Sequence, residues 1–433
     1  MRNRKARIQR ILCTLVFLLA LPSFLFSQGY TWMGASLEGL FRNAPWKIGK
    51  LRGYRAFYIN NAGYDSDIYY GMYEETYPDF TFSTGPSFQW FVPLRKTIIL
   101  DTTQSVQGLF YFKNKDERAL NLRLNGQFHF VFKKFYGQAG LSYSNVRYRF
   151  TPEITMNLRY EEIGWHGTFL WQFSRSGSVA WRLRISDLNH GHAQFGETFL
   201  DEVLDRKESF ADMILYFQPT TKYRFYLDGQ VGEYNFKYFE SKIRNSYSYA
   251  LYGGLMFVPA PSGGRATLQG GFNIGYKYLD PKSPQFNDAS DIVGNGQITL
   301  DLRPSITIRA FYSRDFNVSI YSSLLHYLNT AYGGGFTFHI RNRVDFGNQI
   351  TLSTSNYPLA TEPAENDRRL KFTAVMANLG VRIAREVYFS LNGMIARRTI
   401  YPEGLKFSRH VIGFSLTYGS LPGEMGLPIA STL

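Results

Sequence analysis

The sequence is poor in cysteine and in long apolar runs. Cys13 is the only cysteine among 433 residues, and it lies in a segment that we expect to be removed. We therefore expect neither disulfides nor thiolate chemistry in the mature protein. After residue 27 no stretch contains 18 uninterrupted apolar residues, which argues against membrane-spanning helices.

The one long apolar run covers residues 11–26. It follows five basic residues and ends at Ser27, an arrangement typical of a cleaved secretory signal. A retained anchor is the alternative, although Pro22 and the modest length favour cleavage. Removing residues 1–27 takes away five positive charges and no negative ones, so the formal charge falls from +14 to +9. We expect a basic protein exported into the envelope of a Gram-negative-type bacterium.

Aromatic residues and glycine are abundant, with 31 Tyr, 37 Phe and 39 Gly. The stretch 327–357 shows how they are used, because Phe336, Phe338 and Ile340 alternate with polar residues. Residues 341–343 then reverse the chain. The two arms run to roughly a dozen residues, about twice the usual soluble strand. A long hairpin with one apolar and one polar face is typical of a transmembrane β-barrel, with a soluble sheet as the alternative.

This pattern recurs from residue 53 to residue 419, and it predicts an all-β, transmembrane antiparallel barrel. We count about 18 strands, with 16 as the alternative. Apolar positions such as Leu122 and Phe338 are expected to face lipid, and Asn121 and Thr337 the lumen. The barrel must close, because an open edge in lipid would leave backbone groups unpaired.

Tight turns alternate with longer polar connections, an asymmetry that predicts long loops outside the cell and short turns on the periplasmic side. Near Tyr160 and Ile163 the apolar parity flips, which predicts a bulge or a longer loop. The longer connections are expected at 66–78, 188–209, 281–291, 317–326 and 358–369.

The segment before the strands has a different period. Met33, Leu37, Leu40 and Phe41 fall on one helical face, and Pro45 would end that helix. We expect a short periplasmic or lumen-plugging helix. The predicted organisation is therefore a signal peptide (1–27), a plug segment (28–52), a barrel (53–419) and a tail (420–433).

Two stretches resemble one family. Residues 61–71, NAGYDSDIYYG, resemble the first-strand signature of outer-membrane barrel proteins that bacterial genomes often place with exopolysaccharide export systems. Residues 298–419 resemble the same porin-like group, and the last strand, 411–418, resembles a barrel assembly signal. The chain departs from the pattern at Asp67, where the family more often has Asn, and in its tail. Between residues 97 and 264 the chain shows little similarity to the family. The resemblance implies a porin-like channel or an export-associated barrel.

Arginine recurs on the polar faces of the predicted strands. If these side chains face the lumen, the pore is electropositive and favours anions. The alternative is that they pair with acidic residues such as Asp228, Asp301, Asp345 and Glu161 and only stiffen the wall. The lumen-facing candidates are Arg123, Arg147, Arg149, Arg182, Arg184, Arg224, Arg309 and Arg382.

Other chemistry has weaker support. His190 and His192, or Asp65 and Asp67, could bind a metal, but neither pair has the spacing of a dedicated site. A barrel hydrolase is the second hypothesis and a structural or adhesive barrel the third. Serines and histidines near strand ends form no recognisable nucleophile motif; they are Ser174, Ser355, His326 and His410.

The functional prediction is a porin-like outer-membrane channel that passes, or helps to export, anionic solutes or polysaccharide. Its expected partners are outer-membrane lipid, anionic polysaccharide or small anions, and components of an export system. We expect no cofactor, no metal, no nucleic acid and no enzymatic activity.

Overall fold

The computed structural model describes residues 32–70, 76–149, 153–154, 156–195, 198–258, 266–302, 305–321, 324–341, 343–357 and 368–420. The expected signal peptide lies outside these residues, as do the expected tail beyond residue 420 and most of the connection 358–369.

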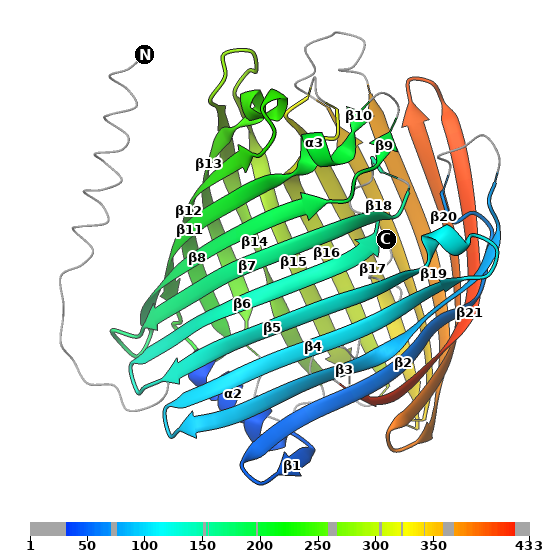
Figure 1. The fold of residues 1–433 in the computed structure, drawn as a ribbon. Coiled ribbons are helices and arrows are strands. Elements are labelled where there is room, and N and C mark those ends of the chain that lie inside the picture. The colour runs from blue at the N-terminus through cyan, green and yellow to red at the C-terminus, as the bar shows by residue number, and fades with distance from the viewer. Residues whose placement is uncertain are drawn as a thin grey trace.

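Within the described residues, 18 long antiparallel strands form a closed barrel (Figure 1). Successive strands pair along the chain, and the first, β2 (Leu51–Asp65), also pairs with the last, β21 (Leu405–Ser420). The predicted closed barrel is therefore confirmed, with 18 strands rather than 16. The strands between them are β3 (Asp79–Arg95), β4 (Ile98–Tyr111), β5 (Ala119–Val131), β6 (Phe135–Tyr148), β7 (Leu158–Trp171), β8 (Gly177–His190), β11 (Arg206–Phe217), β12 (Tyr223–Phe236), β13 (Ser246–Phe257), β14 (Ala266–Pro281), β15 (Ala289–Leu302), β16 (Ile306–Val318), β17 (His326–Ile340), β18 (Val344–Asn356), β19 (Arg369–Ala384) and β20 (Val387–Tyr401).

Several short elements accompany the barrel. The predicted N-terminal helix is present as α2 (Trp32–Asn43), which ends just before Pro45, and β1 (Trp46–Ile48) follows it. None of the described helices is long and apolar enough to cross a membrane. The other short elements lie in the connections between strands: η1 (Lys115–Glu117), β9 (Gln194–Phe195), β10 (Thr198–Phe199), α3 (Leu200–Leu204) and η2 (Glu240–Arg244).

The two ends of the barrel differ as the sequence predicts. The β8–β11 connection holds β9, β10 and α3, and it stands at the opposite end of the barrel from α2 (Figure 1). At the end near α2 the strands are joined by tight turns, such as the one at Arg341, whose φ of 50° lies in the left-handed region that tight turns often use. We call the end with the β8–β11 connection the loop end, and the end near α2 the turn end.

The barrel wall has an apolar outer face and a polar inner face. Phe338 is 40% exposed, whereas Asn121 is 5% exposed, so the predicted parity is confirmed at these two positions. The exposed apolar side chains recur on strands all around the wall. A continuous apolar outer surface is what a barrel in lipid requires.

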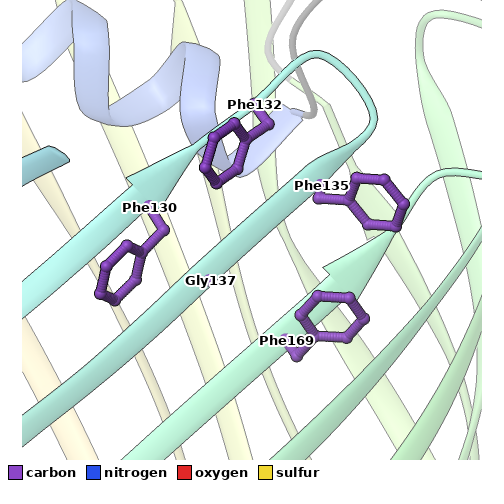
Figure 2. Close-up of a pocket in the computed structure, with 5 residues that line it drawn as sticks. All are labelled: Phe130, Phe132, Phe135, Gly137 and Phe169. Carbon is purple, nitrogen blue, oxygen red and sulfur yellow. The ribbon is translucent and has the colours of Figure 1, made fainter. Parts of the chain in front are cut away.

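Near the turn end the outer face carries a cluster of phenylalanines. Figure 2 shows Phe130, Phe132, Phe135 and Phe169 around an open, apolar depression of about 570 Å³ at Gly137. The rings of Phe135 and Phe169 stack with centroids 5.8 Å apart. This depression belongs to the aromatic girdle expected at a membrane interface rather than to a site for a polar solute.

The bulge predicted near Tyr160 is wrong. β7 pairs with both β6 and β8 without any register shift. Tyr160 is buried, and it packs with Val146 and Leu188. The apolar parity flips because the inner wall near the loop end is itself apolar. A real shift occurs in β2, between Ile59 and Ala62.

Candidate functional site in the barrel interior

At the turn end, α2 lies against the inner wall of the barrel. Leu37 of this helix is 6% exposed and belongs to a buried cluster with Phe91, Leu170 and Ile214 of the wall. The hydroxyl of Tyr54 donates to the Leu40 carbonyl over 2.9 Å. The helix is therefore docked on the inner wall mainly by apolar contacts, as its amphipathic sequence allows.

The loop end is closed by connections that fold inward. Glu153, between β6 and β7, is 1% exposed. Its Oε1 accepts from the Ser319 hydroxyl over 2.8 Å, and its Oε2 accepts from the Ile320 amide over 2.9 Å. Its carbonyl accepts from Arg398 of β20 at 3.5 Å. Since β16 and β20 lie many strands away from β6 around the barrel, this connection reaches across the lumen.

Arg244 joins two other connections to its own at the same end. Its guanidinium is 1% exposed and donates to the carbonyls of Val203 at 2.7 Å, Ser319 at 2.5 Å and Leu324 at 3.1 Å. The group also lies 4.8 Å from the centre of the Phe236 ring. One side chain in η2 therefore ties together the β8–β11, β12–β13 and β16–β17 connections. We call Glu153 and Arg244 with these partners the loop latch.

Burial governs the ionisation of the loop latch. Burial raises the pKa of Glu153 to about 7, although the Ile320 amide, Ser319 and the charge of Arg244 oppose this. Burial also lowers the pKa of Arg244 to about 9, and the neighbouring Arg206 adds to this effect. Glu153 can therefore change its charge near neutral pH.

An apolar core lies beneath the loop latch on the β11–β17 side. Leu200 and Leu204 of α3 pack with Ile320 of the β16–β17 connection and with inward side chains of the wall such as Phe210 and Val293. On the other side of the interior, β2–β6, β20 and β21 line a polar cavity of about 130 Å³. Any solute path at the loop end is therefore expected on this polar side.

Two of the predicted arginines are neutralised by acids. Arg182 lies 3.2 Å from Asp212 and 2.9 Å from Asp228, so the predicted alternative pairing with Asp228 occurs. Arg147 lies 3.1 Å from Glu117 in η1.

Three further arginines have uncharged partners. Arg224 donates to Gln218 Oε1 at 3.1 and 2.7 Å near the turn end. Arg184 lies 4.9 Å from the centre of the Phe210 ring. Arg149 donates to the Ile68 carbonyl.

The last three predicted arginines are Arg123, Arg309 and Arg382. Arg123 and Arg382 are exposed, and Arg309 is half-buried in β16. Arg123, Arg147 and Arg149 line the same polar cavity, whereas the other five are spread over β8, β12, β16 and β19. The structure thus gathers three of the eight predicted arginines in one place.

Among the described residues, the other three acids show no ion pair with a predicted arginine. Asp301 accepts from the Thr307 hydroxyl, Asp345 contacts His339, and Glu161 accepts from the Tyr143 hydroxyl. These acids stabilise local contacts and do not neutralise the predicted arginines.

Sequence reasoning missed a largely buried ion pair of the wall. Arg409 of β21 donates to Asp65 of β2 at 2.9 Å from Nε and 2.5 Å from Nη2. The sequence could predict that Arg409 faces inward, because it alternates along β21 with the outward-facing Ile412 and Phe414. Its partner could not be predicted, because the two residues meet only when the barrel closes.

Three of the histidine and serine candidates, His190, His192 and Ser174, are held by local contacts. His190 Nδ1 lies 3.0 Å from Asp205, and His192 Nδ1 lies 3.1 Å from Asp201. Ser174 accepts from the Gly177 amide at 2.7 Å, within a turn. In the described part of the chain, no group of three or more His, Cys, Asp or Glu residues is arranged to hold a metal.

No family model matches the sequence, and no curated protein matches it. Among solved structures, the chain is similar to Pseudomonas aeruginosa OccK2 (OpdF), at 9% identity and a TM-score of 0.49, covering 85% of this chain and 98% of that one. It is also similar to Acinetobacter baumannii OccAB3, at 12% identity and a TM-score of 0.48, covering 85% and 99%. A third is OpdO of Pseudomonas aeruginosa, at 10% identity, 85% and 97% coverage and a TM-score of 0.45. Likenesses of this size say nothing about what this chain carries.

Proposed function

We propose that this protein is an outer-membrane channel that passes, or helps to export, anionic solutes or acidic polysaccharide. The observation that carries the proposal is a closed 18-stranded barrel with an apolar outer face and arginines on its interior-lining strands. Lipid covers the outer face, and the cleaved signal directs export. Export-system components are the partners that the sequence resemblance implies.

The charge pattern supports anions as the cargo. Arg123, Arg184 and Arg382 have no carboxylate within ion-pair distance among the described residues, in contrast to Arg182. A guanidinium stays charged at any relevant pH and binds carboxylate or phosphate through a planar fork of donors. Several such groups along a low-dielectric wall would concentrate anions without holding one tightly, which conduction requires.

The test is a reversal potential measured in a salt gradient across a planar bilayer. We expect anion preference in the wild type, and we expect it to weaken when Arg182, Arg184 and Arg224 are changed together to Gln. Arg182→Gln also leaves Asp212 and Asp228 without their cationic partner, so the wall around them becomes locally negative while the lumen loses three charges in total.

A matched control removes three cations from the short turns instead, through Lys96→Gln, Lys133→Gln and Arg175→Gln. Its net charge equals that of the lumen variant, but its selectivity should stay close to the wild type. Cation preference in the wild type would reject the proposal and favour a structural barrel or a hydrolase.

A further inference from the structure

The polar cavity on the β2–β6 side has a composition unlike that of a simple anion site. Amide side chains come from five strands or connections around it, at Asn60, Asn61, Gln107, Asn121, Asn157 and Asn392. An amide offers both donors and acceptors in one plane, which suits a hydroxyl group better than a bare anion. The lining therefore indicates a ligand with several hydroxyls.

The amides are held in position but keep unused hydrogen-bonding capacity. Gln107 Nε2 donates to the Ser83 hydroxyl at 3.0 Å, and Asn121 Nδ2 donates to Gln107 Oε1 at 3.4 Å. Each of these two amide nitrogens has a second N–H. Asn157 Nδ2 contacts the Tyr111 hydroxyl at 3.1 Å and Glu117 at 3.3 Å, which orients it. Donors that are already fixed cost little ordering entropy when a ligand binds.

Arg123 brings to the cavity a charge that no acid compensates among the described residues. Arg409 is paired with Asp65, and Arg147 with Glu117. Arg123 is exposed and forms no ion pair with any residue of the described ranges. Its guanidinium is therefore available to a carboxylate on the ligand.

The size of the cavity sets the size of the ligand. Its volume of about 130 Å³ is smaller than that of an apolar cavity of about 150 Å³ that holds one benzene ring, so this partly open cavity can take one edge of a single sugar ring. Apolar surface from Met394 and Val411 also lines it, and such surface can pack against the C–H face of a sugar ring.

We propose that this cavity is a binding site for one acidic sugar residue, whose ring hydroxyls meet Gln107 and Asn121 and whose carboxylate meets Arg123. This inference rests on the proposed function, because it names the class of anion that the channel selects. It goes further by making the hydroxyl groups, and not charge alone, a requirement for binding.

The experiment records single-channel current of the full chain in a planar bilayer with galacturonate, galactose or acetate added. We expect galacturonate to cause transient blocks, galactose to bind about tenfold more weakly and acetate to cause none. Arg123→Gln should weaken galacturonate about tenfold and leave galactose unchanged. Gln107→Leu should weaken both sugars.

Arg382→Gln is the matched control, since it removes an exposed arginine near the turn end. It should lower anion selectivity as much as Arg123→Gln does, without changing the galacturonate block. Acetate blocking as well as galacturonate, or both arginine variants weakening the block equally, would overturn the proposal.

Calorimetry of galacturonate binding in detergent separates this proposal from the proposed function. Binding that depends on Arg123 in a protein without conductance would keep the sugar site and reject the channel. Anion-selective conductance without such binding would keep the channel and reject the sugar site.

Discussion

At the two ends of the barrel interior, segments are held in place by different chemistry. At the turn end, α2 is docked through Leu37 against apolar side chains of the wall. At the loop end, one buried carboxyl and one buried guanidinium hold connections that are far apart in the sequence. An apolar contact weakens gradually as surface is removed, whereas a buried polar contact that loses one partner leaves the other unsatisfied.

This difference determines which end of the barrel can respond to a change of pH. The contacts of Leu37 involve no titrating group, so they should be insensitive to pH. The loop latch contains Glu153, whose pKa of about 7 lies within the range that a cell envelope experiences. The loop end is therefore the end at which a condition-dependent change of conductance is expected.

The largest effect should follow Arg244→Met. Three carbonyls lose a charged donor inside a buried site, and each unsatisfied group costs about 1–3 kcal/mol. We expect the connections to separate, with at least a twofold rise in conductance and new protease cleavage within residues 319–325. Arg382→Met, at the turn end, should leave both unchanged. An unchanged cleavage pattern in Arg244→Met would mean that apolar packing alone closes the loop end.

The contrast between the two ends also marks what the sequence could predict. The period-two alternation placed Asn121 and Phe338 on the correct faces, and the 3.6-residue period located α2. Both predictions depend only on residues that are close to one another in the sequence. The contacts Glu153–Ser319 and Arg409–Asp65 join residues 166 and 344 positions apart, and no local period encodes them.

The same reasoning explains the wrong bulge near Tyr160. The rule that the inner face is polar holds only where that face meets water. Near the loop end the inner wall meets the apolar core of the connections, so apolar residues occur on both faces. A parity flip therefore marked buried loops and not a break in the strand.

A smaller effect is expected at the turn end from Leu37→Ala. Truncating a buried leucine costs about 2–5 kcal/mol, and the low end applies where a helix can settle into the space. We expect α2 to undock part of the time and conductance to fluctuate between two levels. Glu38→Ala, on the exposed side of the same helix, is the control. Steady wild-type current in Leu37→Ala would show that β1 and the hydroxyl of Tyr54 suffice to hold the helix.

The smallest effect is the pH response of the loop latch. Burial raises the pKa of Glu153 from its ordinary 4.5 to about 7. Its neutral form is therefore favoured in the folded state. The stability that this provides is complete below pH 4.5 and is lost as the pH rises toward and through 7. Between pH 6 and pH 8 the loss is about 1 kcal/mol.

We therefore expect conductance to rise between pH 6 and pH 8 in the wild type and to stay constant in Glu153→Gln. Glutamine keeps one oxygen that can accept from the Ile320 amide, its NH2 can donate to the Ser319 hydroxyl, and it cannot ionise. The Leu37→Ala variant should keep the wild-type pH response, since its change lies at the other end. A response that survives Glu153→Gln, or that falls as pH rises, would place the titrating group elsewhere and remove the distinction between a polar, pH-sensitive loop end and an apolar, pH-insensitive turn end.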